Sequence, residues 1–112
     1  MTDESRRIEQ GLLTIQSEPQ NAHLVSLHGE LDGATAKELD AEFIRIEATS
    51  VSRIVLDLSE LDFIDSTGLT MIVKADRRAK NDGQVLRLLR PSGQVGQALA
   101  VSGLDELLAF GN

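Results

Sequence analysis

The chain has 112 residues, with 11 basic and 18 acidic side chains, and therefore a net charge of −7 at neutral pH. A chain of this length suits one domain with a single hydrophobic core. Because it contains no cysteine and only two histidines, disulfide frameworks, thiol catalysis and structural zinc sites are excluded. The acidic balance and the three aromatic residues argue against a nucleic-acid-binding surface, which is typically basic and rich in stacking side chains.

Residues 1–11 are predicted to form a polar N-terminal tail without the apolar region of a signal peptide. Because no export signal is visible, we expect a cytoplasmic protein. No apolar run is long enough for a membrane-spanning helix, and the folded domain is predicted to cover residues 12–110. Leu12–Ser17 and Ala22–His28 have the composition of strands, and Glu18–Asn21 between them contains a proline typical of turns. This part of the sequence predicts a β-hairpin.

A loop, Gly29–Ala34, leads into a helix predicted over residues 35–48. Thr35 and Glu38 have the spacing of a capping box, and apolar side chains recur every three to four residues, as in an amphipathic helix. These apolar positions are Leu39, Phe43 and Ile46. The next run, Ser52–Leu58, has a continuous apolar centre, which is typical of a parallel strand covered on both faces.

A polar segment, Ser59–Leu69, leads into a second predicted helix that ends at about Lys80. The apolar arc of this helix consists of Leu69, Ile72, Val73, Ala75 and Ala79, with Met71 at its edge. Asn81–Gly83 has the composition of a turn, and Gln84–Arg90 predicts a further strand.

Residues 91–93 open a last helical segment, which is interrupted at Gly103. Its predicted apolar contacts are Val95, Leu99, Val101, Leu104, Leu107 and Leu108. The predicted order is therefore β-β-α-β-α-β-α, an α/β fold with a mostly parallel sheet after the N-terminal hairpin, packed by helices. Loops that follow parallel strands usually carry the functional site, which places it at residues 29–34 and 59–69.

Charge is distributed unevenly along the chain. Residues 74–90 carry six basic and two acidic side chains, whereas the remaining residues carry five basic and sixteen acidic ones. Two interpretations are open: a solvated helix face beside a strand end, or a basic patch that orients a protein partner on an otherwise acidic surface.

Three aspartates, Asp57, Asp62 and Asp65, cluster in the sequence within and just before the polar segment, and these suggest an aspartyl-phosphate enzyme. Such an enzyme would also need acids placed to hold Mg²⁺ and a cation for the phosphate, but the lysines of this chain fall on predicted helix surfaces. A serine hydrolase is equally disfavoured, because Ser66 lacks the G-x-S-x-G motif. We therefore predict no enzymatic activity, no bound cofactor and no metal.

Ser66 stands where the second helix is expected to begin. The unpaired N–H groups and the positive end of the helix dipole favour an anion at such a position. Ser66 could cap the helix, or Asp65 could be the cap and leave the Ser66 hydroxyl directed outward. An outward hydroxyl at a helix start is a good phosphate acceptor, and Gly68 would either ease the turn or admit another backbone close by.

The segment Asp62–Leu69, DFIDSTGL, resembles the D-S-[ST]-G-L signature of STAS domains, a family that includes the bacterial anti-sigma factor antagonists. Gly29–Asp32 followed by Thr35–Ala36 resembles the G-E-L-D-x-x-T-A block of the same family. A third, weaker match is Val101–Asp105. Together the three blocks span about residues 12–108 in the expected order, and the chain is identified as a STAS-domain protein.

The resemblance implies that Ser66 is phosphorylated by a serine kinase that is itself the anti-sigma factor, with Thr67 as the less favoured acceptor. It also implies that the unphosphorylated protein binds this kinase and releases the sigma factor, and that a serine phosphatase reverses the modification. The implied partner-binding residues are Glu30, Asp32, Thr35, Asp65, Ser66, Thr67, Gly68, Leu69 and Met71. Neither nucleic acid nor a membrane is an expected partner. The alternative is an accessory or scaffold subunit of a transporter or signalling complex, docking through the same loop.

Overall fold

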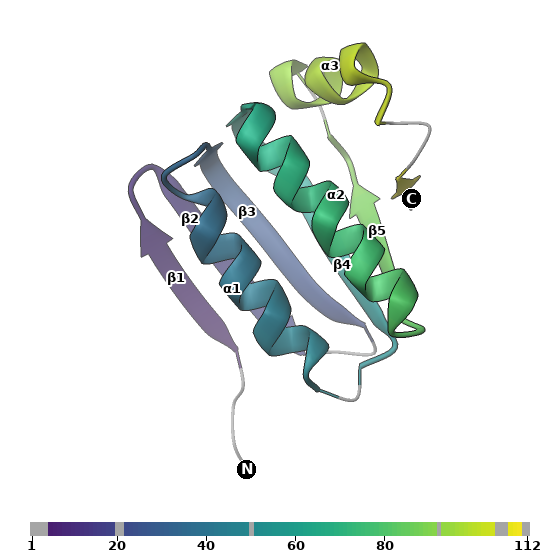
Figure 1. Ribbon diagram of the computed structural model, residues 1–112. Coiled ribbons are helices and arrows are strands. Elements are labelled where there is room, and N and C mark those ends of the chain that lie inside the picture. The colour runs from purple at the N-terminus through teal and green to yellow at the C-terminus, as the bar shows by residue number, and fades with distance from the viewer. Residues whose placement is uncertain (1–4, 20–21, 50, 92, 105–107, 111–112) are drawn as a thin grey trace.

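A computed structural model of the chain describes residues 5–19, 22–49, 51–91, 93–104 and 108–110 (Figure 1). In chain order its elements are β1 (Arg6–Gln10), β2 (Leu13–Pro19), β3 (His23–Leu31), α1 (Ala36–Glu47), β4 (Arg53–Ile64), α2 (Ser66–Asn81), β5 (Val85–Leu89), α3 (Gly93–Ser102) and β6 (Ala109–Phe110). The predicted turn residues Gln20 and Asn21, and the predicted apolar contact of Leu107, lie outside the described residues. The predicted α/β fold class is confirmed.

The strands form one sheet in the order β1-β2-β3-β4-β5-β6. The first two strand pairs are antiparallel and the other three are parallel, as the predicted hairpin and the alternation of strands and helices require. Helices α1 and α2 lie across one face of the sheet, and α3 lies beyond the carboxyl ends of β4 and β5 (Figure 1). Both α1 and α2 begin at this same edge.

The sheet is covered by helices on one face only, which corrects the prediction for residues 52–58. Burial alternates along β4, where Ile54 and Leu56 are buried while Val55 and Asp57 are only half-buried. Right-handed crossovers that always step to the next strand in the same direction place every helix on the same side of the sheet. The continuous apolar run of β4 therefore does not report burial on both faces.

Strand β4 is longer than predicted and ends at Ile64 rather than at Leu58. Leu58, Leu61 and Ile64 are all buried, although their spacing of three residues does not match the two-residue period of a regular strand. The pairing of β3 with β4 shifts register twice over this stretch, and such bulges turn the extra residues so that the apolar side chains return to the core. Because the two-residue period is missing, the sequence predicted a polar segment instead of a continued strand after Leu58.

Two strands were not predicted. The segment predicted as a polar tail contains β1, which pairs with β2 and is mostly exposed; its one apolar residue, Ile8, leaves no strand-like pattern to read. At the other edge of the sheet, β6 has only two residues and pairs with β5. The predicted helix break is confirmed, because α3 ends at Ser102 and Gly103 has a φ of 76°.

The core lies between the helices and the covered face of the sheet. The predicted apolar positions of α1 are all buried, and so are Ile72, Ala75 and Ala79 of α2 together with Met71. An Arg78 guanidinium joins the two helices by ion pairs to Asp40 at 2.8 Å and to Glu47 at 2.9 Å. These contacts join the carboxyl-terminal part of α2 to α1 and keep the two helices side by side, while the site lies at the opposite, amino-terminal ends of both helices.

Candidate functional site: two loops around an exposed serine

The loops β3–α1 and β4–α2 meet at the carboxyl edge of the sheet. Only Asp65 separates the end of β4 from the start of α2, and its backbone N–H donates to the Leu31 carbonyl at 3.2 Å. At the neighbouring position, Ile64 exchanges two hydrogen bonds with the Gln94 side chain of α3, at 2.9 and 3.1 Å. Gln94 was not singled out in the sequence because no motif marks a contact between α3 and the end of β4.

The Asp65 carboxylate holds both loops. One oxygen, Oδ1, accepts from the Gly68 N–H at 2.9 Å and caps α2, while Oδ2 accepts from the Gly33 N–H at 3.1 Å. Of the two local arrangements left open by the sequence, the one with Asp65 as the cap is therefore confirmed, and the one with Ser66 as the cap is wrong. A carboxylate at the positive end of α2 is also favoured by the helix dipole.

Gly68 allows the first turn of α2 to approach β3. A Cβ atom at this position would lie 2.9 Å from Ile64 Cγ1, 3.0 Å from Leu31 Cγ and 3.1 Å from the Leu31 carbonyl oxygen. These distances are shorter than normal carbon contacts. The prediction that Gly68 admits a close neighbour is confirmed, and the neighbour is the end of β3.

The β3–α1 loop is organised by Asp32. Its Oδ1 accepts hydrogen bonds at 3.0 Å from the backbone N–H groups of Ala34 and Thr35 and from the Thr35 hydroxyl. The hydrogen bonds from Thr35 lower the pKa of Asp32, which keeps this carboxylate ionised. The predicted capping box is not formed: Thr35 precedes α1 without a side-chain cap, because its hydroxyl turns back to Asp32.

Ser66 is the first residue of α2, and its side chain is exposed. Its hydroxyl makes no side-chain hydrogen bond within the described part of the chain, whereas its carbonyl accepts from the Thr70 hydroxyl at 2.9 Å. Ser66 borders a cleft of about 290 Å³ between α2 and α3, which is lined mainly by apolar atoms of Leu69, Val73 and Leu104. The hydroxyl is thus accessible from solvent at a helix N-terminus.

Thr67 points elsewhere, although it is adjacent in sequence. It borders a different cleft, between α1 and α2, and its Oγ1 lies 3.8 Å from the position that a Cβ on Gly33 would occupy. The two predicted phosphate acceptors therefore face different surfaces, because successive helical residues are rotated by about 100°.

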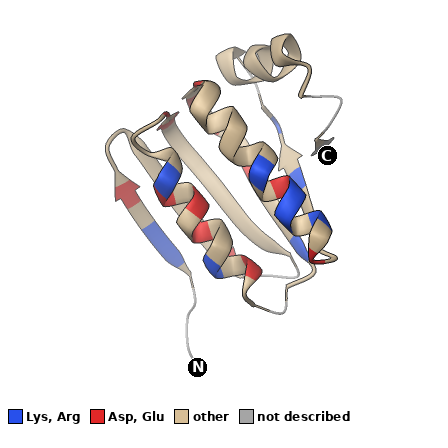
Figure 2. Ribbon diagram, viewed as in Figure 1, with Lys and Arg blue, Asp and Glu red and all other residues tan. Residues whose placement is uncertain are grey.

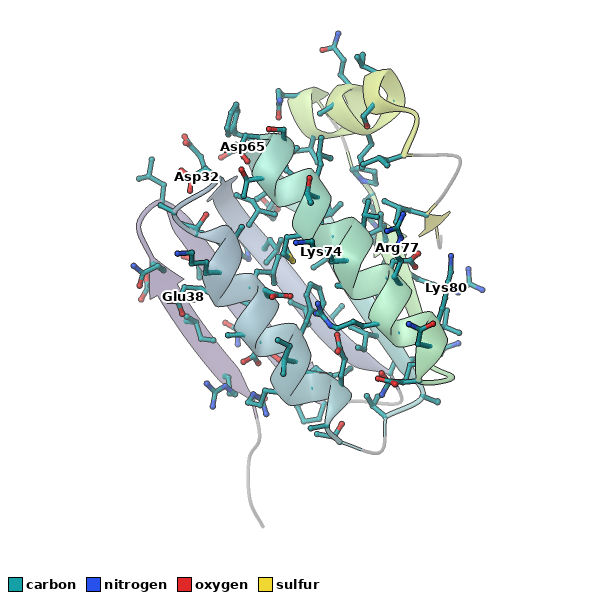
Figure 3. All side chains as sticks on the ribbon, in the orientation of Figure 1. Asp32, Glu38, Asp65, Lys74, Arg77 and Lys80 are labelled. Atoms are coloured by element: carbon teal, nitrogen blue, oxygen red, sulfur yellow. The ribbon has the colours of Figure 1, made fainter. Side chains whose placement is uncertain are left out.

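Two acidic side chains lie at the start of α2, the helix that Ser66 begins. Asp32 and Asp65 lie near each other at the start of α2, as Figure 3 shows, and neither is ion-paired with another described residue. The first turns of α2 carry no basic side chain, and the lysines and arginines of this helix lie farther along it (Figure 2). A phosphoryl group on Ser66 would therefore meet the helix dipole but no cation from the first two turns of α2.

The predicted partner-binding residues fall into two groups. Glu30, Asp32, Asp65 and Leu69 are partly exposed, and Ser66 and Thr67 are exposed. In contrast, Thr35, Gly68 and Met71 are buried, so these three shape the surface from beneath.

The acids that suggested an enzyme do not form a common site. Asp57 accepts from the Ser59 N–H at 2.9 Å and lies 3.7 Å from Arg90, Asp62 is exposed, and Asp65 is engaged in capping. The described residues contain no group of three or more His, Asp or Glu side chains arranged to hold a metal ion. Of the histidines, His23 is buried and bonded to Ser17 at 2.7 Å, which agrees with a structural role.

Within the described ranges, no helix is long and apolar enough to cross a membrane.

Comparison with known proteins finds a similar sequence in an anti-sigma-B factor antagonist of Staphylococcus aureus strain NCTC 8325 / PS 47. The two sequences are 27% identical over 84 residues, which cover 75% of this chain and 78% of that protein.

Two solved structures share the fold. An anti-sigma factor antagonist from Mycobacterium paratuberculosis matches with a TM-score of 0.79 and 23% identity, over 88% of this chain and 84% of that one. The anti-sigma factor antagonist SpoIIAA in its unphosphorylated form matches with a TM-score of 0.74 and 25% identity, over 88% of each chain. The family model of the STAS domain matches residues 15–112, and the chain therefore belongs to the STAS domain family.

Proposed function

We propose that this protein is an anti-sigma factor antagonist controlled by phosphorylation of Ser66. Unphosphorylated, it binds an anti-sigma factor that is also a serine kinase and so releases a sigma factor in the cytoplasm. Phosphorylated, it loses this affinity until a serine phosphatase removes the phosphate. In this scheme the protein is a substrate and binding partner and catalyses no reaction itself. The observation that carries the proposal is the exposed Ser66 hydroxyl at the start of α2, beside a cap that Asp65 already provides.

The names of the similar proteins support this proposal, since the S. aureus relative and both solved structures are anti-sigma factor antagonists. The position of Ser66 supports it physically. Because Asp65 caps α2, the Ser66 hydroxyl is not needed to hold the helix, and modification would leave the fold intact. A kinase can reach the hydroxyl without unfolding the loop.

Electrostatics explains how one phosphate could control binding. Phosphorylation adds about −1.5 to −2 charges, and the helix dipole stabilises such a group by about 0.3–1 kcal/mol. A partner carboxylate at ~4 Å would repel each unit of charge by about 4 kcal/mol at an effective dielectric constant of ~20. The repulsion between the phosphate and the partner carboxylate is therefore larger than the stabilisation by the helix dipole. A net penalty of about 3–4 kcal/mol weakens binding by two to three orders of magnitude.

The proposed partner-binding surface consists of the exposed and partly exposed residues of the two loops, from Glu30 to Asp32 and from Asp65 to Leu69. The apolar cleft between α2 and α3 opens beside Ser66. A partner side chain seated there would contact the serine directly, so that a phosphate would oppose it by charge and by volume. Thr35 and Gly68 keep the loops in place beneath this surface.

The test is intact-mass analysis after incubation with ATP and purified candidate anti-sigma factor kinases, with the site mapped by fragmentation. We expect one added phosphate on Ser66, none in Ser66→Ala, and retained kinase binding by that variant. Ser66→Glu should bind the kinase at least tenfold more weakly while its circular dichroism stays native. Phosphate on Thr67 would overturn the assignment of the acceptor. Partner binding that is indifferent to Ser66→Glu would instead favour the accessory or scaffold subunit.

A further inference from the structure

The second cleft of the site lies between the amino-terminal parts of α1 and α2, where Thr67 marks one end. It has a volume of about 150 Å³ and is lined by Ala36, Lys37, Asp40, Thr67, Met71 and Lys74. Ala36 and Met71 are 3% and 6% exposed, so they form an apolar floor. Lys37 and Lys74 are exposed and border it from opposite helices. Figure 3 shows Lys74 projecting from α2 toward α1.

The two lysines are not neutralised within the described part of the chain. Asp40, the only acid that lines the cleft, is already paired with Arg78 at 2.8 Å. No ion pair involves Lys37 or Lys74 among the described residues. The cleft therefore presents two ammonium groups above an apolar floor in a protein whose net charge is −7.

The structure also shows which part of the basic sequence run 74–90 is available. Arg78 is paired with acids of α1, Lys80 lies 3.0 Å from Asp76, and Arg90 lies 3.7 Å from Asp57. Lys74 differs from these because it joins Lys37 of another helix at the cleft. The run is therefore not one continuous patch of available cations, because three of its basic side chains are ion-paired within the protein.

We infer that this cleft receives an acidic segment of the protein partner. A partner carboxylate would lie between Lys37 and Lys74, and an adjacent apolar side chain would pack on Met71 and Ala36. This inference rests on the proposed function, whose partner it describes further. An ammonium group is a strongly hydrated point charge with three donors, and paired lysines over an apolar floor match a carboxylate flanked by an aliphatic or aromatic side chain.

The arrangement of charge at this edge gives the partner a defined register. Asp32 and Asp65 would repel an acidic segment, whereas the lysines of the adjacent cleft attract it, so the segment is directed toward α1 and away from Ser66. Complementary charges of this kind chiefly raise the association rate and exclude wrong orientations. A phosphate on Ser66 would add to the repulsion from Asp32 and Asp65. It would not remove the attraction that the two lysines of the cleft exert on the acidic segment.

A synthetic peptide tests the cleft without any kinase. The probe is acetyl-Glu-Leu-Glu-Glu-Leu-Glu-amide, titrated into isotope-labelled protein and followed by the backbone amide resonances in NMR spectra. We expect the resonances of residues 36–40 and 67–74 to shift, and the dissociation constant to rise about five- to tenfold in Lys37→Glu/Lys74→Glu. The matched control is Arg53→Glu, which reverses an exposed cation without an ion pair among the described residues, at the opposite end of β4.

The outcomes separate this inference from the proposed function. The inference would be overturned if the peptide shifted resonances outside the cleft, or if Arg53→Glu lost as much affinity as the double variant. It would also be overturned if a peptide with lysine in place of glutamate bound equally well. If a single-stranded oligonucleotide bound through the same lysines, the inference would be overturned, because the ligand of the cleft would be a nucleic acid and not an acidic protein segment. Where a kinase phosphorylates Ser66, Lys37→Glu/Lys74→Glu should slow association with it about tenfold at low salt. An unchanged association rate would reject the cleft while leaving the function of Ser66 intact.

Discussion

At the scale of single residues, the carboxylate of Asp65 makes two structural contacts. It caps α2 through Gly68 and fastens the other loop through Gly33, and the second contact joins positions 32 residues apart in sequence. The cap was predictable, because an acid directly before a helix is a common local pattern. The second hydrogen bond was not, since nothing local marks Gly33 as its donor.

Substitutions at Asp65 should separate these two contacts. Asp65→Asn retains an acceptor for the cap but replaces the other oxygen by a nitrogen that cannot accept, so we expect it to destabilise the fold by about 1 kcal/mol. Asp65→Ala removes both acceptors and should cost about 2 kcal/mol. Urea denaturation measures both free energies of unfolding. Asp62→Ala, at an exposed position, should stay within about 0.5 kcal/mol, and an equal loss there would contradict this assignment.

At the scale of elements, the site depends on how closely α2 approaches the end of β3. Gly68 is buried at that contact, and neither neighbouring atom group can move freely, because Ile64 and Leu31 are core residues. From the sequence, Gly68 could either ease the turn or admit another backbone close by. The packing of α2 on the sheet shows that it admits the end of β3. The same packing places the Ser66 hydroxyl outward.

Gly68→Ala should therefore destabilise the protein although alanine is the better helix former. The gain in helix propensity is about 1 kcal/mol, and overpacking against a well-filled core typically costs about 1–3 kcal/mol. The difference is an expected net loss of up to about 2 kcal/mol in the free energy of unfolding, which urea denaturation measures. Gly33→Ala is the control, because its new Cβ would meet only Thr67 Oγ1, at 3.8 Å. A more stable Gly68→Ala protein would show that α2 can shift away from β3.

At the scale of the whole molecule, a buried carboxylate ties the N-terminal strands to α1. Glu42 is 2% exposed and binds Arg45 at 2.6 Å and Arg6 of β1 at 3.3 Å. Burial alone would raise the pKa of Glu42, but hydrogen bonds from Arg45 and Ser17 and the charges of both arginines outweigh it and lower the pKa below 4.5. The edge strand β1, absent from the predicted fold, is held partly by this network.

This network predicts how stability depends on pH. A carboxylate whose pKa is lower in the folded state stabilises the fold above its unfolded pKa, and this contribution is lost as the pH falls through the folded value. The free energy of unfolding should therefore decline below about pH 4.5, the ordinary value for glutamate. Glu42→Gln should be less stable at neutral pH and show a shallower decline in urea denaturation between about pH 5 and 3. A parallel decline in both proteins would exclude Glu42 as a source.

Much of the architecture follows from local patterns that the amino-acid sequence carries by itself. Helical periodicity located α1 and α2 and placed Ser66 near the start of a helix, and the proline-containing turn indicated the hairpin. These features depend on neighbours in sequence, for which backbone geometry and propensity are sufficient. The length of β4 escaped this reasoning, because bulges abolish the two-residue period on which it relies.

Only the tertiary structure decided the remaining features, because each depends on residues that packing brings together from distant parts of the chain. Covering one face of the sheet follows from the direction in which successive crossovers step, which no single strand records. The contact of Asp65 with Gly33 needs two loops at one edge. The cleft with Lys37 and Lys74 needs two helices side by side. The charge of −7 argued against a nucleic-acid surface, but only the fold showed which cations line a common cleft.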